Sequence, residues 1–403
     1  MPGRTRSLIW PSHPTLHAPL RHRKACRYES FVPDTLASFR LGLDATVAGQ
    51  VSEAEHEIRL LNDEGGGALA PLSRLLLRTE SIASSKLEGM QAGVRELARA
   101  EAKAEAGLTP GPTAREVLAN IAAMVTAVDE AAQREEFGEA EILAIHRRLL
   151  EHTTRRRIAG TFRSVQNWLG GNDYTPCGAD FVPPPPEEVA PLLRDLCAAI
   201  ADETLPPLVQ AALVHAQFET IHPFEDGNGR TGRALVHVVL RRRGIAPRFV
   251  PPISVVFANA RERYIAGLTA FRGDDAGAWL ADFATAMTAA ARLARVYLAR
   301  VQSLQGTWRE QLRATAKPPR ADAAAWLIIE HLPAHPVITA ASAAAATGRA
   351  IPRVHEGLAQ LVAAGVLLPL TSGRRNQMWE ATGLLGMIGE VEEGLAGGGR
   401  ATT

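Results

Sequence analysis

Apolar residues at helical spacing are the feature of this sequence that most constrains its fold. Val117, Ile121, Met124 and Val128 recur every three or four residues, which places them on one face of an α-helix. Segments with comparable spacing, rich in Ala, Leu and Arg, cover most of the chain, and the first is expected near residues 35–61. We therefore expect a mainly α-helical protein.

One long stretch breaks the helical pattern. Residues 160–186 read GTFRSVQNWLGGNDYTPCGADFVPPPP, with alternating residues, a Gly-Gly-Asn turn and four consecutive prolines. Alternation around a glycine turn favours a β-hairpin, and a proline run favours a stiff extended connector. We expect a hairpin here that leads into the next helix.

Bulk properties limit the class of protein. The 403 residues exceed one ordinary core, so two or three domains are expected. A net charge of +1 gives no global electrostatic case for nucleic-acid binding. No apolar run approaches the roughly 20 residues that a membrane span needs. Cys26, Cys177 and Cys197 have no metal-site spacing and cannot all pair, which fits structural or incidental thiols in a reducing, cytoplasmic compartment.

Composition also predicts how the chain is divided. The end of the chain suggests three short helices followed by two strands, which is the winged helix-turn-helix pattern. The expected parts are a disordered lead-in (1–25), an N-terminal helical module (26–110), a core (111–312), a linker (313–320), a winged helix domain (321–390) and a disordered tail (391–403).

The segment HPFEDGNGR, at residues 222–230, lies where one helix ends and the next begins. A helix N-terminus presents unpaired N–H groups and a partial positive charge, so it attracts anions. Gly227 and Gly229 let backbone N–H groups converge on phosphate oxygens, and Arg230 and Arg233 can reach further phosphates from the first turn.

The same segment carries groups suited to chemistry beside a phosphate chain. His222 is the residue whose ordinary pKa suits proton abstraction near neutral pH, and Asp226 can hold Mg²⁺ next to phosphates. Phe224 is assigned to the core as the anchor of the loop. Each feature alone has a simple structural explanation, but their combination at fixed spacing argues for a site. This reasoning leaves AMP transfer and phosphate transfer both open.

HPFEDGNGRTGR resembles the signature of the Fic family (filamentation induced by cAMP), His-x-Phe-x-Asp/Glu-Gly-Asn-Gly-Arg-x-x-Arg, at every defining position. The similarity extends over about residues 28–300. It implies a Fic-type helical bundle with a β-hairpin flap, to which this chain adds the C-terminal winged helix domain.

The resemblance implies transfer of AMP from ATP to a Tyr, Thr or Ser hydroxyl of a protein, with release of pyrophosphate. His222 would deprotonate the hydroxyl, and Asp226 would hold Mg²⁺ between the α- and β-phosphates. Asn228 and the amides of Gly227 and Gly229 would cradle phosphate, with Arg230 on the β-phosphate and Arg233 on the γ-phosphate. Tyr264 is a candidate lining residue of the nucleotide pocket.

Two further segments acquire roles from the same resemblance. The flap would pair with the target segment by β-augmentation and align its hydroxyl; its docking residues are Asn167, Trp168, Leu169, Gly170 and Gly171. The segment SSKLEG is similar to the family's inhibitory motif, with Ser84 and Glu88 on one helix face before Gly89. Glu88 would pair with Arg233 and keep ATP from settling productively, and in some relatives this glutamate serves removal of AMP.

A rival interpretation belongs to another class of protein. The C-terminal module places Arg349, Arg353 and His355 on a recognition helix and Arg374 and Arg375 on the wing. DNA binding would make the chain a nucleotide-sensing transcriptional regulator or an antitoxin-like protein. The presence of both His222 and the flap favours the enzyme. The identity of the target protein stays open, and the chain itself is one candidate. Whether the chain assembles into a homo-oligomer also stays open.

Overall fold

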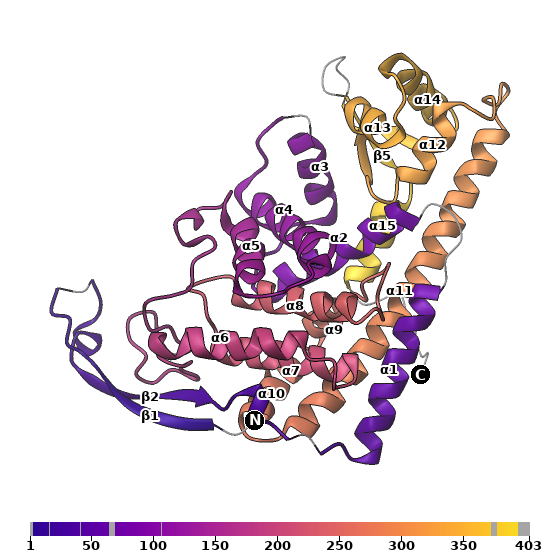
Figure 1. Cartoon of the computed structure of the whole chain (residues 1–403). Coiled ribbons are helices and arrows are strands. Elements are labelled where there is room, and N and C mark those ends of the chain that lie inside the picture. Colours follow the sequence, from indigo (N-terminus) through magenta and orange to yellow (C-terminus); the bar gives the residue numbers. More distant parts are fainter. Residues whose placement is uncertain are drawn as a thin grey trace, which may run out of the picture. The chain divides into compact units, whose positions relative to one another are not determined.

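The structure is a computed structural model that describes residues 3–15, 17–40, 42–63, 69–105, 107–371 and 377–393. It is mainly helical, as the apolar spacing predicts (Figure 1). The chain divides into two compact units. Unit 1 comprises residues 1–55, 123–245 and 261–285, and unit 2 comprises residues 56–122, 246–260 and 286–403. Unit 1 thus joins the N-terminal arm to most of the expected core.

Unit 1 begins with a two-stranded antiparallel ribbon of β1 (Gly3–Trp10) and β2 (Cys26–Pro33). All eight positions pair, from Gly3 with Pro33 to Trp10 with Cys26. The predicted disorder of residues 1–25 is therefore wrong for residues 3–10. The basic composition suggested disorder, but alternate arginines of β1 form ion pairs with α6 (Pro186–Ala201), from Arg4 and Arg6 to Glu188.

The first long helix, α1 (Ala45–Asp63), begins ten residues later than the sequence pattern suggested. Its start is set by Asp44, whose carboxylate accepts hydrogen bonds from the backbone N–H groups of Thr46 and Val47 at 2.8 and 2.9 Å. The residues before it contain only a short 3-10 turn, η2 (Leu36–Ser38).

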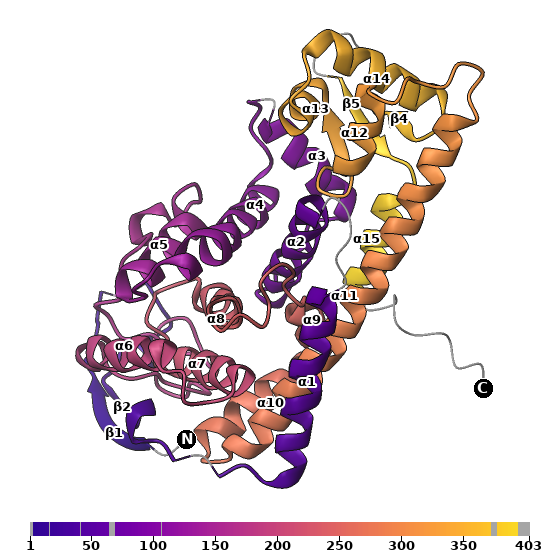
Figure 2. The same cartoon turned by 45° about the vertical axis from the view of Figure 1, so that its right-hand side comes forward.

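The other helices of unit 1 surround the 222–228 loop. In both views α6 and α7 lie side by side (Figures 1 and 2). The helical segments are α5 (Glu139–Leu150), α6 (Pro186–Ala201), α7 (Pro207–Ile221), α8 (Asn228–Arg242) and α10 (Arg261–Arg272), the π-helical turn η3 (Thr126–Glu130), and the 3-10 turns η1 (Leu20–His22), η4 (Ala131–Gln133) and η5 (Arg156–Ile158).

Close packing of α7 on α8 requires a glycine. A Cβ at Gly232 would lie 2.9 Å from the Phe218 ring and 2.6 Å from the Glu219 carboxylate. Val236 and Leu240 continue the fully buried face of α8. The helix pair that brackets the 222–228 loop is therefore held at short range.

The flap differs from the predicted hairpin. A single antiparallel bridge between Leu169 and Phe181 replaces two paired strands. Gly170 and Gly171 both have left-handed backbones, with φ of 73° and 74°. The Asn172 side chain then accepts hydrogen bonds from the N–H groups of residues 174 and 175, each at 2.9 Å. The residues that would pair in a longer hairpin form these local turns instead.

The N-terminal ribbon is tied to the flap by a disulfide bond between Cys26 and Cys177, whose Cα atoms are 6.3 Å apart. Two of the three cysteines thus form a disulfide where incidental thiols were expected, and the thiol argument for a reducing compartment does not hold. The two cysteines are 151 residues apart, so their pairing could not be read from spacing. Cys197 is a buried free thiol, and burial raises its pKa to about 12.

Unit 2 combines helices from three parts of the chain with a three-stranded antiparallel sheet of order β3-β5-β4. Its elements are α2 (Leu69–Leu87), α3 (Val94–Glu105), α4 (Pro112–Val125), α9 (Ile253–Asn259), α11 (Ala276–Arg313), α12 (Ala324–His331), β3 (Val337–Thr339), α13 (Ala340–Thr347), α14 (Ile351–Ala363), β4 (Leu367–Pro369), β5 (Met378–Ala381) and α15 (Leu384–Glu392). The first residues of α11 and the last of α4 belong to unit 1.

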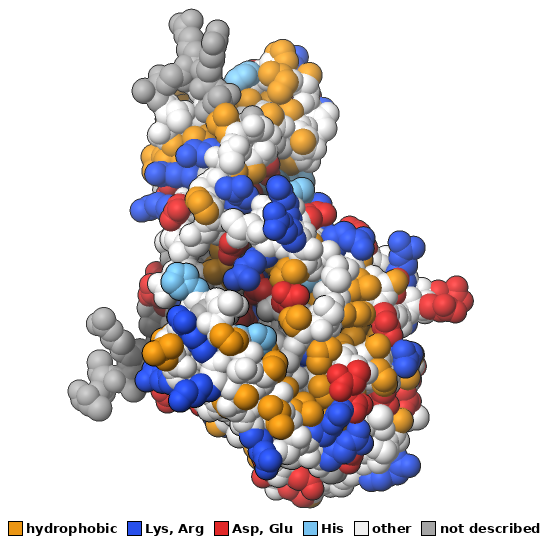
Figure 3. Space-filling model, turned by 90° about the vertical axis from the view of Figure 1, so that its left-hand side faces the viewer, with side chains coloured by type: hydrophobic (Ala, Val, Ile, Leu, Met, Phe, Trp, Pro, Cys, Tyr) orange, Lys and Arg blue, Asp and Glu red, His pale blue; other side chains and the backbone are white. Residues whose placement is uncertain are grey.

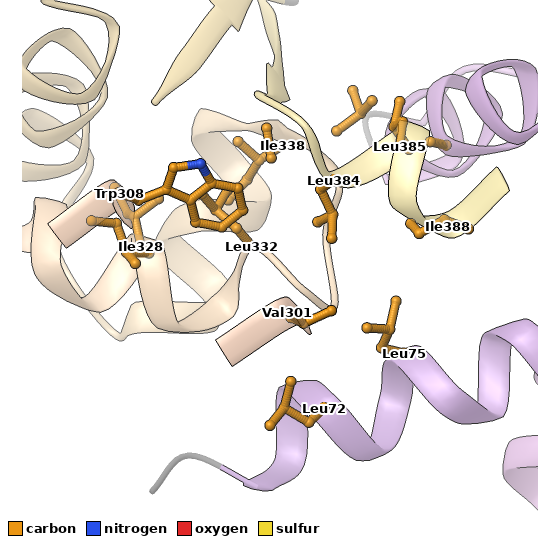
Figure 4. Close-up of a cluster of buried hydrophobic side chains, with 14 of the residues drawn as sticks. Leu72, Leu75, Val301, Trp308, Ile328, Leu332, Ile338, Leu384, Leu385 and Ile388 are labelled. Carbon is orange, nitrogen blue, oxygen red and sulfur yellow. The ribbon is translucent and has the colours of Figure 1, made fainter. Parts of the chain in front are cut away.

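One hydrophobic core joins α2 and α3 to the C-terminal elements (Figure 4). Leu72 and Leu75 of α2 belong to the same cluster as Trp308 of α11 and Leu384 of α15. The C-terminal module is thus packed with α2 rather than separated from it. α11 ends at Arg313, at the start of the expected linker, and α15 continues to residue 392, past the expected boundary at 390.

Candidate active site

The backbone of His222 adopts a conformation that side chains disfavour. The residue follows the end of α7 with φ of 50° and ψ of 60°, in the left-handed region. Among the non-glycine residues that the structure describes, only Asp274 shares a positive φ. Such a conformation costs free energy and persists where surrounding contacts hold it, often at functional sites.

Arg163 and Asn167 supply those contacts. Arg163 donates from Nε to the His222 carbonyl at 2.9 Å, and its backbone N–H donates to the Pro223 carbonyl at 2.9 Å. The Asn167 side-chain amide donates to the carbonyls of His222 and Phe224 at 3.3 and 2.9 Å. The flap is therefore fastened to the loop at the histidine and at the two residues that follow it. Sequence reasoning placed Asn167 in target docking and overlooked Arg163.

The imidazole of His222 is mostly covered, with 14% of the side chain exposed. Its Nδ1 lies 4.0 Å from a carboxylate oxygen of Glu219, one helical turn earlier on α7. A carboxylate on the Nδ1 side favours the tautomer that leaves Nε2 free to accept a proton. The spacing of three residues on one helix was the signal that could have identified Glu219.

Asn228 and Gly227 shape the loop from within. The Asn228 side chain accepts from the backbone N–H of Phe224 and donates to its carbonyl, both at 2.8 Å. Gly227 has φ of 82°, and a Cβ there would lie 3.0 Å from Leu149 and 3.4 Å from His146. The Asn228 side chain thus forms two hydrogen bonds within the loop, and its role at phosphate stays a prediction.

Asp226 offers the carboxylate expected to hold Mg²⁺, and its side chain is 34% exposed. Its Oδ1 accepts from the Gly227 N–H at 2.6 Å and lies 3.5 Å from Arg230. Its Oδ2 lies 3.6 Å from the exposed Arg155, which sequence reasoning did not include. No group of three or more His, Cys, Asp or Glu suited to a metal occurs in the described ranges. One accessible carboxylate fits Mg²⁺, which takes most of its ligands from phosphates and water.

Arg230 and Arg233 are brought together on the first two turns of α8, and both are buried, at 4% and 1% exposure. Gly229 lies in the first turn, and Gly227 is the residue that precedes the helix. Two buried guanidiniums at a helix N-terminus make a strongly anion-attracting environment. His222 and Asp226 precede α8, and both arginines lie on its first two turns; their roles at phosphate stay predictions.

Phe224, in the 222–228 loop, packs against His146 of α5. Phe224 is fully buried, which confirms its assignment as the core anchor. Its ring stacks on the His146 imidazole with centroids 3.6 Å apart and an interplanar angle of 10°. Burial lowers the pKa of His146 to about 4, so the ring is neutral at physiological pH. Sequence reasoning treated His146 as an ordinary helix residue.

Of the remaining flap residues, Trp168 contacts the N-terminal ribbon. Trp168 packs edge-on against Trp10, with ring centroids 5.6 Å apart, and donates from Nε1 to the Asn172 carbonyl. Leu169 is 37% exposed and carries the bridge to Phe181. The two glycines that follow form the turn at the tip.

Tyr264 lies in the interior of unit 1, where 9% of the residue is exposed. Its hydroxyl is 2.9 Å from Nε2 of His215, and its ring is 6.3 Å from that of Trp279. Burial lowers the pKa of His215 to about 3, followed in effect by the charge of Arg233. Because the tyrosine is engaged in this packing, little of its surface is left for a nucleotide base.

The predicted inhibitory residues lie in unit 2, at the end of α2. Ser84 is fully buried, whereas Glu88 is exposed. The helix ends at Leu87, so Glu88 is in the turn that follows rather than on the helix, and Gly89 closes the turn with φ of 79°. Arg233 belongs to unit 1, and its pairing with Glu88 stays a prediction.

Surface charge and hydropathy agree with the bulk composition. Acidic and basic side chains are interspersed over the face drawn in Figure 3. Within the described residues, no helix is both long and apolar enough to cross a membrane. Arg374 and Arg375, assigned to the wing, lie outside those residues.

Comparison with known proteins gives the site a family. Residues 136–240 match the family model of the Fic/DOC family, and residues 49–129 match that of the Fic/DOC family N-terminal region. The first match contains the whole 222–233 motif, together with His146, Arg163 and the flap.

Individual relatives agree with this assignment. The chain is 32% identical over 139 residues to protein adenylyltransferase fic-1 of Caenorhabditis elegans, covering 34% of this chain and 24% of that protein. It is 30% identical over 196 residues to a protein of Aquifex aeolicus (strain VF5) described as a probable protein adenylyltransferase, covering 48% and 54%. The chain therefore spans between a quarter and about half of the length of these relatives.

Solved structures support the fold. A Fic family protein from Desulfovibrio desulfuricans G20 superposes with a TM-score of 0.51 at 21% identity, over 85% of this chain and 98% of that one. This likeness covers most of both units. The likeness shows the fold, and the two family matches, with the complete motif at the end of α8, identify a Fic/DOC region and its N-terminal companion within residues 49–240 of this chain.

Proposed function

We propose that the protein is an adenylyltransferase that transfers AMP from ATP to a hydroxyl group of a protein. The observation that carries the proposal is the placement of His222, held in a left-handed conformation, next to the α8 N-terminus with its buried arginines Arg230 and Arg233. A base beside a polyphosphate site suits transfer of a nucleotidyl group to a hydroxyl. Relatives named protein adenylyltransferases point to the same reaction.

In this reaction the target hydroxyl oxygen attacks the α-phosphorus and gives its proton to Nε2 of His222. The bond between the α-phosphorus and the bridging oxygen breaks, and pyrophosphate leaves. The backbone N–H groups at the start of α8, with Arg230 and Arg233, hold the β- and γ-phosphates. Mg²⁺, held by Asp226, would supply charge neutralisation between the α- and β-phosphates.

The flap is the proposed docking surface for the target. Arg163 and Asn167 fasten the flap to the carbonyl of His222. A segment of the target protein paired along residues 167–171 would therefore be held at a fixed distance from the His222 imidazole. Positioning of this kind supplies much of the rate in bimolecular transfer. The chain itself is the first target to examine.

Self-inhibition is proposed through Glu88. An Arg–carboxylate pair in a partly covered site is worth a few kcal/mol, on the order of 2–3 kcal/mol. Pairing with Arg233 would deprive the γ-phosphate of its partner and suppress transfer by roughly tenfold for each 1.4 kcal/mol. The position of Glu88 in an exposed turn, directly after a helix that is well packed in unit 2, makes the carboxylate accessible to a partner. In the alternative form of this proposal, the Glu88 carboxylate serves the reverse reaction, which removes AMP from the target protein.

A sensing role is the second candidate function. The succession α12, β3, α13, α14, β4 and β5 supports a winged helix domain, and its core is shared with α2. Arg353 on α14 is 75% exposed but pairs with Glu356 at 3.1 Å, which weakens the electrostatic case for DNA. A mobility shift with genomic fragments that weakens with salt would favour the regulator.

Labelled ATP separates AMP transfer from the alternatives. We expect protein-bound label from ATP labelled in the α-phosphate and none from ATP labelled in the γ-phosphate. The His222→Ala variant should incorporate neither. Label from the γ-phosphate alone would replace AMP transfer with phosphoryl transfer, and binding of ATP with no label from either the unmodified chain or its Glu88→Gly variant would favour the sensor.

A further inference from the structure

His146 is a buried histidine beneath the candidate active site to which no role has been given. It lies on the face of α5 directed at the 222–228 loop, and none of its surface is exposed. Its ring covers that of Phe224, and its edge approaches the position where Gly227 lacks a Cβ. It therefore contacts the loop at both ends of the segment that carries Asp226.

Two hydrogen bonds fix which nitrogen of His146 carries the proton. The backbone N–H of Gly160 donates to Nδ1 at 3.0 Å, so Nδ1 is the acceptor. A neutral imidazole has one donor and one acceptor, so the proton is on Nε2. Nε2 lies 3.0 Å from the backbone carbonyl of Asp226 and donates to it.

The approach of Gly160 also has a structural requirement. Its φ is 67°, and a Cβ there would lie 3.0 Å from Cβ of Arg147 and 3.1 Å from the Leu143 carbonyl. A glycine is thus needed where the chain enters the flap in order to bring its N–H onto the imidazole. His146 connects the first residue of the flap segment to the backbone of the loop.

We propose that His146 is a positioning residue for the Asp226 carboxylate, which it orients through the Nε2–H bond to the Asp226 carbonyl. Asn228 and Asn167 fix the loop at Phe224, two residues earlier, and His146 fixes it at Asp226, the residue whose carboxylate is the proposed Mg²⁺ ligand. The proposal rests on the proposed function in one respect, that Asp226 holds the Mg²⁺ of Mg-ATP. Partners behind a ligand of this kind typically change metal affinity or activity about 10- to 100-fold.

Three substitutions separate this role from simple packing. His146→Phe keeps an aromatic ring against Phe224 and removes both hydrogen bonds. His146→Gln places an amide N–H near the Nε2 position and can still donate to the Asp226 carbonyl. His146→Asn places a carbonyl near Nδ1, where it can serve Gly160 only. Circular dichroism and thermal unfolding report whether each variant is folded.

The primary readout is binding and needs no turnover. In the full-length His222→Ala background, calorimetry gives the ratio of ATP affinities with and without Mg²⁺. We expect His146→Phe to lower this ratio about tenfold or more, His146→Gln to restore most of it, and His146→Asn to restore none. In an Asp226→Asn background, His146→Phe should change the ratio by less than about twofold, because the two residues act as a unit.

A fall in the affinity ratio in all three variants that follows their loss of thermal stability would mean that His146 acts only through packing. The same change in ratio with and without the Asp226 carboxylate would also overturn the proposal. Failure of the proposed function is distinguishable, because it would appear as absence of AMP transfer by the Glu88→Gly variant with His146 intact, while the Mg²⁺ dependence of ATP binding can still be measured.

Discussion

Arg163 and His222 are joined by a hydrogen bond of 2.9 Å, from the guanidinium Nε to the backbone carbonyl of the histidine. The same guanidinium donates to the carbonyls of Val165 and Pro184. One buried side chain therefore connects the start and the end of the flap segment to the backbone of His222. Burial lowers the pKa of Arg163 to about 10, which leaves it cationic at neutral pH. This contact network holds His222 in its left-handed conformation.

Replacing Arg163 should therefore reduce both stability and AMP transfer. Arg163→Lys keeps the charge but cannot serve several carbonyls at once, and we expect it to cost about 2–3 kcal/mol in the free energy of unfolding. A displacement of the His222 side chain by about 1 Å lowers the rate of transfer about 100-fold. Denaturant unfolding and the initial rate of α-phosphate labelling measure the two effects. A Lys variant with full activity would show that His222 does not depend on this clamp.

A methyl group at residue 227 should disrupt the loop. Gly227→Ala places a side chain at φ of 82° against Leu149, and we expect a loss of about 1–2 kcal/mol in the free energy of unfolding together with loss of ATP binding. Gly306→Ala on α11 is the matched control. Nothing lies within 4 Å of a Cβ there, and a helical alanine should stabilise by about 0.5–1 kcal/mol. Both values come from chemical denaturation, and equal effects at the two positions would contradict the steric argument.

The disulfide should stabilise unit 1. Loss of the Cys26–Cys177 bond, by Cys26→Ser or by a dithiol reductant, should lower the free energy of unfolding by about 2–4 kcal/mol. Reductant added to the Cys26→Ser, Cys177→Ser double variant provides the control and should have no effect. Thiol counting under denaturing conditions without reductant should find one free cysteine, Cys197; three free thiols would mean that the bond does not form.

Acid should destabilise the fold through buried histidines. The pKa of His215 is about 3 in the folded protein, below its ordinary value of 6.5, so between these values the unfolded chain binds a proton that the folded chain does not. Stability is therefore fully present above pH 6.5 and falls as pH drops, by up to about 1.4 kcal/mol per pH unit for this residue. His215→Gln can keep the contact with Tyr264 and should flatten the pH dependence of the unfolding free energy by up to one proton. An unchanged slope would contradict the assignment.

Much of the site could be predicted because its residues are contiguous. His222, Asp226, Arg230 and Arg233 fall within twelve consecutive positions, so a helix that begins at Asn228 has all four near its N-terminal end. The helical class followed from apolar periodicity for the same reason, since both signals are local in sequence.

What could not be predicted depends on contacts between distant segments. The pairing of Cys26 with Cys177 and the bonds from Arg163 and His146 to the loop join residues dozens of positions apart. β1 looked disordered because its composition is basic, while its stability comes from a partner strand and the acidic start of α6. The flap was read as a hairpin because a glycine pair suggests a tight turn, yet both glycines take left-handed conformations in a longer loop.

The Glu88→Gly variant tests the central claim most directly. ATP labelled in the α-phosphate should label this variant, or a protein mixed with it, at least tenfold faster than it labels the chain with Glu88 intact, because Arg233 becomes available to the γ-phosphate. ATP labelled in the γ-phosphate should give no label, and His222→Ala in the same background should abolish the signal. Equal labelling with and without Glu88 would remove self-inhibition from the account, and absence of α-phosphate label from Glu88→Gly in the presence of Mg-ATP and candidate target proteins would contradict AMP transfer itself.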